Sequence, residues 1–548
     1  MRRLTALRFA ALLALSASVL LLTARGIRIR VLGAPSPRPS QSSCIALSVD
    51  NTRLVNVNED VHTVTVFNAM TTPPTVIAEI PVGLDPTSVA INPAASKAYV
   101  ANSFSGTVSV VDLTALAVTN TIPVGAEPMG VAVSPNGTRL YVASSASNSM
   151  TVVDTMTETV IATVDLSAFG NAPRAIAITN DGDNNDANET IFVAMFFSQL
   201  RAGKTSLDEG QDDQREGRVV AISAATNTVL AAIILAPIAN TGFNANGRLA
   251  PANGLTPAVA STNPAAFTTP TGAFPNQLAA IGLQPNSGRA YVVSTAASPN
   301  GPFRFNTNAQ GLVSVFNTAS RTEITAAQTD PIVRRTAPLN LNQGVNLATT
   351  PAPRLFMTNP VAMDWRPNGS DAWIAIQNSD VIVRMTVDAA GIPTISCPLV
   401  AGPSQITRSD LQTGPIAGKA PRGIVIDSTG TRAFVSNFVS RSVSVVDISS
   451  PTAPVIVATA ASSPLPQPGT DEATIQLGEE LFYSGRNRMS SESWGSCAVC
   501  HPQGRSDNVT WMFDSGPRQT IPLDGTFANG LRRILTGVPC ATRFTISS

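Results

Sequence analysis

Cysteine, histidine and charge are all scarce in this sequence. Its 548 residues include five cysteines and two histidines, and only 13% of them are charged. Five scattered cysteines do not make a disulfide-rich scaffold, although Cys44 and Cys397 could form one bridge. Basic and acidic residues balance at 36 each, so nothing in the charge favours nucleic acid or an anionic membrane as a partner.

Long apolar runs are also missing, except at the N-terminus. Arg2, Arg3 and Arg8 precede an apolar run from Phe9 to Leu22, and small residues follow it. This arrangement is typical of a secretory signal peptide, with cleavage after position 24 or 34. An uncleaved anchor is the alternative, but the run is shorter than the roughly 20 residues of a membrane span. The sequence predicts a periplasmic or cell-surface protein without a transmembrane anchor once the signal is removed.

Two segments repeat without gaps at an offset of 42 residues. "VGLDPTSVAINPAASKAYVANSFSGTVSVVDL" begins at Val82, and "VGAEPMGVAVSPNGTRLYVASSASNSMTVVDT" begins at Val124. Each unit contains three short alternating strands separated by turns, and the connecting segment provides a fourth strand. Four strands in 40–45 residues is the period of a propeller blade.

Looser copies of this unit bring the count to seven. They begin at Cys44, Pro173, Asn276, Asn359 and Pro421. A ring of sheets leaves only short, protected strand edges, which suits an exported protein. The sequence therefore predicts a mainly β protein built on a seven-bladed propeller.

The strands "AYVAN" and "LYVAS" beside "GTVSVVD" resemble the repeats of YVTN-type β-propeller proteins. The resemblance covers Cys44 to Ala460 and is interrupted at Leu200–Gly217 and Ala236–Pro275, which we expect to be loops over one face. It implies the propeller fold and an extracytoplasmic location but no fixed chemistry, so function has to be argued from the sites.

Three of the rare residues lie within five positions, in Cys497-Ala-Val-Cys500-His501. In C-x-x-C-H the two thiols lie one helical turn apart, so both can form thioethers to haem vinyl groups while the imidazole binds the iron. A redox C-x-x-C would want a βαβ context, which is absent, and a zinc site would have only Cys540 as a further ligand. The motif predicts covalent haem c, with Cys497 and Cys500 as the thioether residues and His501 as the proximal iron ligand.

The flanks of this motif carry a second resemblance. Residues 469–486 predict a helix capped by Thr470 or Asp471 and ended by Gly485. From Gly469 to Phe527 the chain resembles the haem domain of bacterial di-haem cytochrome c peroxidase-like and MauG-like proteins. The matching residues are Gly478, Leu481, Phe482, Ser496, Cys497, Cys500, His501, Gly516, Arg518, Gln519, Thr520 and Leu523.

This sequence departs from that family in the number of haem sites. The resemblance implies two haems, but the chain has one C-x-x-C-H and no later histidine, and "GLRRILTGVPCATRFTISS" at its end no longer resembles the family. If the protein is an enzyme, the resemblance implies a haem-dependent, peroxidase-like oxidoreductase. The missing second site favours electron transfer instead.

The sixth iron ligand is open to several interpretations. Met512 is the predicted distal ligand, Met489 is the alternative, and otherwise the site is open or holds water. His62 is expected in the alternating strand "VHTVTVF", partly exposed and without a partner for hydrolytic catalysis. Arg505 and Arg518 could pair with haem propionates or could be solvated surface charges.

One acidic segment, "NDGDNNDANET" at positions 180–190, supplies hard oxygens at alternating spacing. Asp181, Asp183, Asn185 and Glu189 are candidate Ca²⁺ ligands, and a plain solvated turn is the alternative.

The sequence thus predicts four regions. Residues 1–34 are a signal peptide and leader, 35–460 the propeller, 461–474 a Pro-rich linker and helix start, and 475–548 an incomplete, small α-helical cytochrome c-like haem domain. The expected function is that of an exported c-type haem protein that exchanges electrons with an unknown partner protein. The alternatives are a fragment of a di-haem peroxidase or MauG-like oxidoreductase, and a cell-surface binding propeller with a vestigial haem domain.

Overall fold

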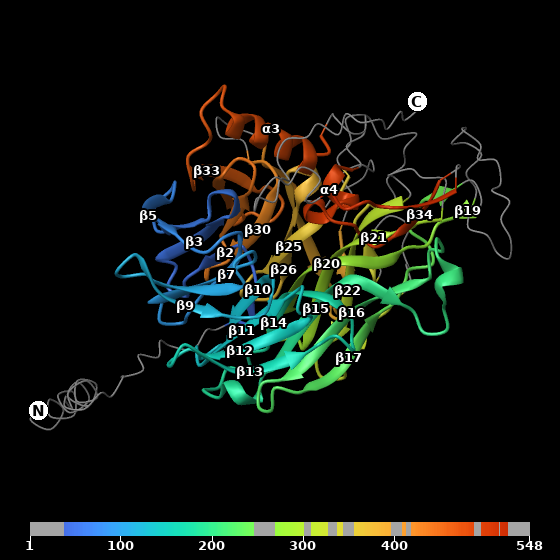
Figure 1. Ribbon diagram of the computed structural model, residues 1–548, viewed down its shortest axis with the longest axis horizontal. Helices are drawn as coiled ribbons and strands as arrows, with labels where there is room; N and C mark the ends of the chain where they lie inside the picture. The colour runs from blue at the N-terminus through green and yellow to red at the C-terminus, as the bar shows by residue number, and fades with distance from the viewer. Residues whose placement is uncertain are drawn as a thin grey trace, which may run out of the picture. The chain divides into compact units, whose positions relative to one another are not determined.

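Seven antiparallel sheets, built mainly from strands that follow one another in sequence, make up most of the protein (Figure 1). The computed structural model describes residues 38–245, 269–300, 308–326, 337–342, 356–395, 408–412, 418–486, 495–513 and 516–523. The seven predicted blades are confirmed, and we number them from the N-terminus.

The first three blades have four strands each and follow the predicted repeat. Their strands are β2 (Ile45–Leu47), β3 (Arg53–Asn58), β4 (Thr63–Asn68), β5 (Thr75–Pro81), β6 (Pro86–Ile91), β7 (Lys97–Asn102), β8 (Thr107–Asp112), β9 (Ala117–Pro123), β10 (Pro128–Val133), β11 (Arg139–Ser144), β12 (Ser149–Asp154) and β13 (Thr159–Asp165).

Blades four to six carry the insertions, and blade seven returns to the simple repeat. Their strands are β14 (Asn171–Ile178), β15 (Thr190–Leu200), β16 (Arg215–Ser223), β17 (Val229–Leu235), β20 (Phe274–Gln284), β21 (Arg289–Ala297), β22 (Ala309–Asn317), β23 (Thr322–Glu323), β24 (Leu339–Asn340), β25 (Pro360–Trp365), β26 (Asp371–Ile376), β27 (Val381–Val387), β28 (Pro393–Thr394), β29 (Arg408–Asp410), β30 (Pro421–Ile426), β31 (Arg432–Asn437), β32 (Ser442–Asp447) and β33 (Val455–Ala461). The insertion between blades four and five adds a separate two-stranded sheet of β18 (Asn244–Ala245) and β19 (Thr269–Pro270).

The repeated residues have identifiable structural roles. The Asp112 carboxylate, at the end of β8, accepts hydrogen bonds from the backbone N–H groups of Thr114 and Ala115 and so closes the next turn. The Asn102 side chain, at the end of β7, donates to Thr107 Oγ1 and Ser109 Oγ on β8. Asn437 makes the same pair of bonds in blade seven. These contacts explain why Asn and Asp recur at fixed positions of the repeat.

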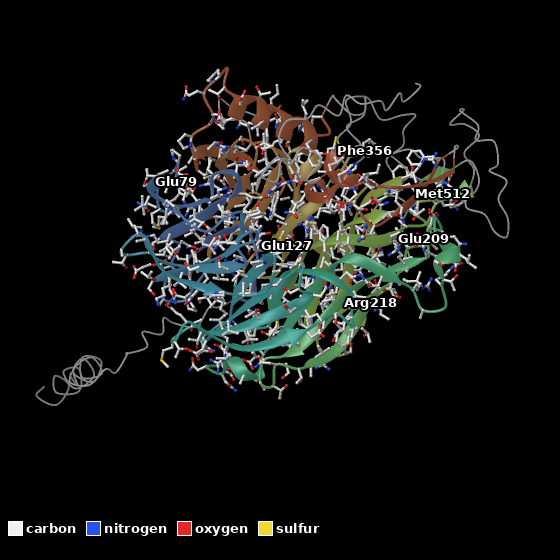
Figure 2. The ribbon with its side chains drawn as sticks, viewed as in Figure 1. Glu79, Glu127, Glu209, Arg218, Phe356 and Met512 are labelled. Atoms are coloured by element: carbon white, nitrogen blue, oxygen red, sulfur yellow. The ribbon has the colours of Figure 1, made fainter. Side chains whose placement is uncertain are left out.

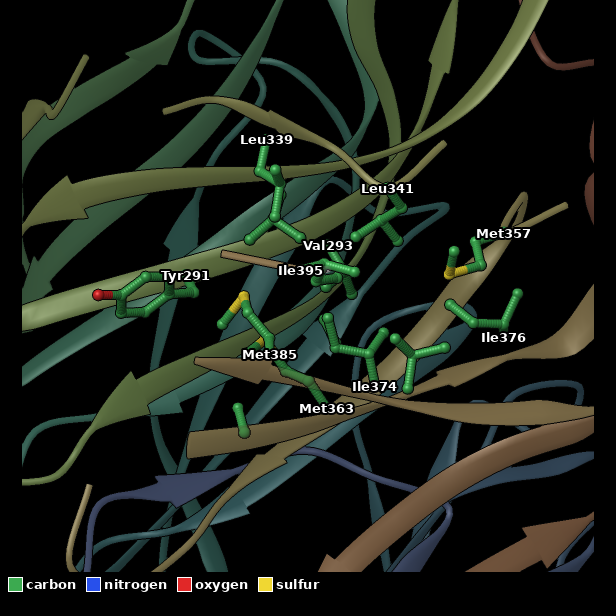
Figure 3. Close-up of a cluster of buried hydrophobic side chains, with 14 of the residues drawn as sticks. Tyr291, Val293, Leu339, Leu341, Met357, Met363, Ile374, Ile376, Met385 and Ile395 are labelled. Carbon is green, nitrogen blue, oxygen red and sulfur yellow. The ribbon is translucent and has the colours of Figure 1, made fainter. Parts of the chain in front are cut away.

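Apolar packing between neighbouring blades provides the core. Alternate residues of a strand face opposite blades: Val100 packs with blade one, and Tyr99 packs with blade three. Each of the seven interfaces between blades has its own buried cluster. Figure 3 shows the cluster between blades five and six, where Tyr291 of β21 faces Met363 and Met385.

The innermost strands close the ring. They touch one another in the order β2, β6, β10, β14, β20, β25, β30, and β30 touches β2 again. Side chains make this last contact, since Phe67 of blade one packs with Phe434 and Val443 of blade seven. Within the described residues, no strand is shared between blades one and seven.

A short segment, Arg38–Ser43, runs among these inner strands. Its strand β1 (Ser40–Gln41) pairs with β14. Arg38 donates to the Ile426 carbonyl at 2.8 Å, and the Val89 N–H donates to the Ser43 carbonyl at 2.8 Å. We call Arg38–Ser43 the axial segment, because it ties blades two, four, six and seven to one another.

The chain after blade seven packs on the propeller. It contains α3 (Asp471–Tyr483), α4 (Cys497–Cys500), and a hairpin of β34 (Thr510–Phe513) and β35 (Gly516–Gln519). Thr470 caps α3 by accepting a hydrogen bond from the Ala473 N–H, and α3 ends at Tyr483. These are the α-helices of the described residues, and they belong to the same compact unit as the blades. A separate α-helical domain is not seen in this part of the chain.

Short 3₁₀ turns complete the described secondary structure. They are η1 (Glu59–Val61), η2 (Asp186–Asn188), η3 (Ser206–Asp208), η5 (Gln377–Ser379) and η6 (Pro502–Gly504). Among the described helices, none has the length and apolar character needed to cross a membrane.

Replacing Trp373 by alanine tests the packing between blades. The Trp373 side chain is fully buried between blades six and seven, so its loss is expected to lower the free energy of unfolding by about 3–5 kcal/mol. The midpoint of urea unfolding measures this change. Leu207→Ala is the control, because Leu207 is 87% exposed. Equal midpoints for the two variants would contradict the expectation.

Candidate functional site

The two motif cysteines lie at the ends of a single helical turn. Helix α4 spans Cys497 to Cys500, and His501 follows as its C-terminal cap, with its N–H donating to the Cys497 carbonyl at 2.8 Å. Neither cysteine is in a disulfide. The chain therefore holds two thiols and one imidazole within one turn, as the spacing predicted.

The Cys500 thiol lies in an apolar cluster. It packs with Phe274 and Ala297 of blade five and with Val509 and Trp511 of the C-terminal segment. Burial raises the pKa of the Cys500 thiol well above its usual range, and the nearby Asp507 acts in the same direction. The Cys500 thiol is therefore protonated at pH 7 and is not itself a reactive thiolate.

His501 is half-buried and has one ring nitrogen without a partner. Nδ1 is buried and makes no hydrogen bond, whereas the ring is hydrogen-bonded to the backbone of Ile521. Burial lowers the pKa of His501 from its usual value, and the Ile521 hydrogen bond opposes that shift. The imidazole is therefore neutral at pH 7, the form in which histidine binds a metal.

Hydrogen bonds from the start of β20 hold α4 against blade five. The Gln277 side chain donates to the Val499 carbonyl at 2.7 Å, and the Asn276 side chain donates to the Asp507 carbonyl at 2.9 Å. Asp507 in turn accepts a hydrogen bond from Trp511 Nε1 at 2.9 Å. Burial raises the pKa of the Asp507 carboxyl to about 7. The motif is thus fixed by polar contacts to the propeller.

Met512 lies on the other face of β34. Val509, Trp511 and Phe513 face Cys500, whereas the Met512 side chain packs at Gly210, in the long loop of blade four (Figure 2). Alternation along a strand separates these two faces. The structure therefore does not bring Met512 to Cys500, and its role as the distal ligand stays a prediction.

The two arginines considered for haem propionates differ in their surroundings. Arg505 forms a two-pronged ion pair with the Glu127 carboxylate of blade three. Arg518 is exposed and donates to the carbonyl of its neighbour Pro517. Arg505 therefore serves to anchor the segment after α4 to the propeller.

Helix α3 covers a buried group of charges at blades one and seven. The Arg422 guanidinium is ion-paired with Glu59 and lies 3.5 Å from the centre of the Phe438 ring. It also lies 4.8 Å from the ring of Tyr483 on α3. Glu479, one turn before Tyr483, is buried, and its Oε2 has no hydrogen-bond partner.

A cavity of about 170 Å³ lies among the inner strands, next to α3 and α4. Tyr483 of α3, Ala498 of α4 and the following Pro502 and Gln503 form part of its wall. In five blades the inner strand contains a proline near its start, and the residue after this proline lines the cavity. These residues are Thr87, Met129, Arg174, Val361 and Arg422.

Sequence reasoning missed this cavity, although a signal was present. In each of those blades a residue with positive φ precedes the proline: Asp85, Glu127, Ala172, Asn359 and Ala420. The repeats can be aligned on Pro86, Pro128, Pro173, Pro360 and Pro421. The residue directly after each proline then occupies the same position in its blade, and in all five blades this residue lines the cavity. Two of those positions hold arginine.

The acidic loop of blade four is saturated with internal hydrogen bonds. The Asn188 amide donates to both the Asp181 and the Asp183 carboxylates, and Asn185 accepts from the Ala187 N–H. Glu189 accepts from Thr179 Oγ1 and the Asp181 N–H. In the described part of the chain no group of three or more His, Cys, Asp or Glu residues could hold a metal ion. Calcium binding here stays a prediction.

His62 is not in a strand, contrary to our prediction. It is the residue after η1, with a positive φ of 58°, in the turn between β3 and β4. The alternating pattern begins at Thr63, and the ring Nδ1 accepts a hydrogen bond from the Asp85 N–H at 3.2 Å. The turn, rather than a strand face, fixes this histidine.

Several predicted residues lie outside the described part of the chain. They are the N-terminal leader, Cys397, Met489, Cys540 and the end of the chain after Leu523. Cys44 is described, as a free thiol on the wall of the cavity. The proposed Cys44–Cys397 bridge is therefore not addressed.

The fold and this site define a seven-bladed propeller with a C-x-x-C-H segment packed on it. No family model matches the sequence, and no curated protein matches it. Among solved structures, a hydrazine synthase of Kuenenia stuttgartiensis is similar, with 17% identity, a TM-score of 0.51, and coverage of 78% of this chain and 99% of that chain. A functionally unknown protein of Desulfotomaculum acetoxidans has 13% identity, a TM-score of 0.43 and the same coverage. The first similarity shows the fold alone.

Glu479→Gln tests how α3 is held on the propeller. Burial raises the pKa of the Glu479 carboxyl to about 8, and the negative charge of Asp60 adds to this. Between pH 4.5 and 8 the folded protein keeps this proton while the unfolded chain releases it, so stability falls as pH rises through that window. The free energy of unfolding should therefore decrease between pH 5 and pH 8. We expect this decrease to be smaller by roughly 2–4 kcal/mol in Glu479→Gln than in the wild type.

Urea unfolding at pH 5, 6.5 and 8 measures this pH dependence. Glu472→Gln, an exposed position in the first turn of the same helix, is the matched control and should keep the profile of the wild type. A Glu479→Gln profile parallel to that of the wild type would rule out this role for Glu479.

Proposed function

We propose that this protein is an exported c-type haem protein that transfers electrons through a single covalent haem held beside a β-propeller. The observation that carries the proposal is the placement of Cys497, Cys500 and His501 on one helical turn. Two thiols at this spacing followed by an imidazole are the donor set for haem c. The predicted leader at residues 1–34 supports export, and the redox partner is an unidentified protein.

The donor set fits haem in its chemistry. Neither cysteine is in a disulfide, and His501 Nδ1 is a buried polar atom without a partner. The Cys500 thiol lies in apolar surroundings, where Phe274, Trp511 and Phe513 belong to the same cluster. A porphyrin needs surroundings of this kind.

The space beside α4 is small for a macrocycle. The cavity holds about 170 Å³, whereas pockets for drug-sized ligands have roughly 300–1,000 Å³. Attachment of haem would therefore require α4 and β34 to move apart from blade five. The contacts that would open are those of Gln277 with Val499 and of Asn276 with Asp507.

Each residue of the site would have one task. Cys497 and Cys500 would fix the group to α4, and His501 would bind the iron through a ring nitrogen. When bound, haem supplies a one-electron couple whose potential depends on the axial ligands and on burial. The propeller would still hold α4 through Ala498, which packs with Ala420 and Val439 of blade seven.

Replacing both motif cysteines tests covalent attachment. The full-length protein, produced in a strain competent in cytochrome maturation, should give a haem-stained band after denaturation. Cys497→Ser with Cys500→Ser should give a band without stain, because no thioether can form. Cys44→Ala is the matched control, since Cys44 is a free thiol on the cavity wall, and it should keep the stain. A colourless wild-type band would refute the proposal.

Replacing His501 separates attachment from iron ligation. His501→Ala should keep the covalent stain but change the Soret band and the reduction potential, because the iron loses its imidazole. The absorption spectrum and a redox titration measure both. His62→Ala changes the other histidine of the chain and should leave them as in the wild type. Identical spectra for His501→Ala and the wild type would show that another group binds the iron.

A further inference from the structure

The cavity contains one cation that lacks a carboxylate partner. Arg174, in β14 after Pro173, lines the cavity, and its Nε is buried without a hydrogen bond. Its guanidinium carbon lies 3.6 Å from the centre of the Phe196 ring. Among the described residues no carboxylate forms an ion pair with Arg174.

The two other arginines nearby are neutralised by carboxylates. Arg422 is paired with Glu59, and Arg505 is paired with Glu127. Of the side chains described on the cavity wall, Arg174 alone has a buried nitrogen or oxygen without a partner. The unpaired charge is therefore specific to this position and not a general property of the cavity.

Arg174 is partly exposed on the cavity wall and has no carboxylate partner among the described residues, so an anion in the cavity would supply the missing counter-charge. A buried donor left without a partner destabilises the folded protein, and more so when it is charged. Burial lowers the pKa of Arg174 to about 9, and the positive charge of Arg505 adds to this effect. The guanidinium still carries its charge at pH 7, so it can bind an anion.

We propose that this cavity is a binding site for one small carboxylate, held by Arg174. The Phe196 ring, 3.6 Å from the guanidinium carbon, holds the guanidinium at the cavity wall, and a guanidinium can donate two parallel hydrogen bonds to one carboxylate. As a site for a free acid, it does not depend on whether haem is attached to α4.

The rest of the wall defines the size and charge of the ligand. The side chains of Gln277, Thr87 and Asn359 already donate to the Val499 carbonyl, the Pro128 carbonyl and Gln377 Oε1. Met129, Ala175 and Val361 are apolar lining residues. With one unpaired cation and about 170 Å³ of space, the cavity suits a short aliphatic monocarboxylate better than a dicarboxylate.

Two kinds of molecule could supply this carboxylate. It could belong to a free short-chain acid or to a propionate of haem held by α4, because Ala498 of α4 lines the same cavity. Butyrate is the probe for both, since it presents one carboxylate on a short aliphatic chain.

Titration calorimetry of the exported full-length protein with sodium butyrate tests the site. Butyramide, the uncharged analogue, and sodium chloride at equal ionic strength are the ligand controls. We expect saturable binding of butyrate that is at least tenfold weaker in Arg174→Gln and intermediate in Arg174→Lys, which keeps the charge without the planar fork. Arg139→Gln, an arginine paired with Asp154 in blade three, should bind as the wild type does.

The variant with Cys497→Ser and Cys500→Ser separates the two sources. If the ligand is a free acid, this variant and the wild type both bind butyrate. If it is a haem propionate, only the cysteine variant binds butyrate, and Arg174→Gln shifts the reduction potential of the haem protein. A protein that carries no haem but binds butyrate through Arg174 would refute the proposed function and leave this site intact.

The site is overturned by three outcomes. These are the absence of butyrate binding in both the wild type and the cysteine variant, equal binding of butyrate and butyramide, and unchanged affinity in Arg174→Gln. Circular dichroism melting of each variant shows whether it is folded. Should Arg174→Gln fail to fold, the affinity of Arg174→Lys decides, and a value equal to that of the wild type counts against the site.

Discussion

Apolar packing between neighbouring blades is the interaction on which the whole structure depends. A four-stranded sheet cannot bury both of its faces alone, so each blade is stable only between two others. The seven buried clusters, one at each interface, show how complete this dependence is. The cluster of Phe67, Phe434 and Val443 also closes the ring, because none of the described strands crosses from blade one to blade seven. The cavity and the position of α4 exist only once that contact is made.

Much of the fold could be predicted because the repeat is made of strands and turns that depend on residues close together in the sequence. Alternating apolar residues such as Val100 and Val142 define strands buried on both faces, and Asp112 and Asp154 end strands at tight turns. These signals lie within about forty residues of one another, so they are visible without the tertiary structure. We predicted His62 in a strand because it directly precedes the alternating residues of β4. In the structure it lies in the turn that follows η1. The axial segment could not be predicted, since its strand is two residues long and its partners are far away in the sequence.

The candidate site also has features that depend on nearby residues and could be predicted, and features that depend on distant residues and could not. The C-x-x-C-H spacing is local, and the predicted helical turn is where the thiols and the imidazole lie. The surroundings of that turn depend on contacts from Gln277, Asn276 and Glu127, which belong to other blades. Arg174 follows the same rule: its place after Pro173 is a local feature, but its lack of a carboxylate partner appears only when five inner strands meet around one cavity. A sequence can indicate which residues face the axis, and the closed ring determines which of them remain unpaired.

The axial segment has a consequence for the order of assembly. Arg38 is hydrogen-bonded to the carbonyl of Ile426, which lies 388 residues further along the chain. A chain that emerges with its N-terminus first therefore makes Arg38–Ser43 long before blade seven, which holds it. Insertion of this segment and closure of the ring become one late event, governed by contacts of very long sequence separation. Until then the apolar faces of blades one and seven, with Phe67 and Phe434, remain open to water and to other chains. The interval between synthesis of the first blade and arrival of the last is thus the period in which this protein is most vulnerable to aggregation.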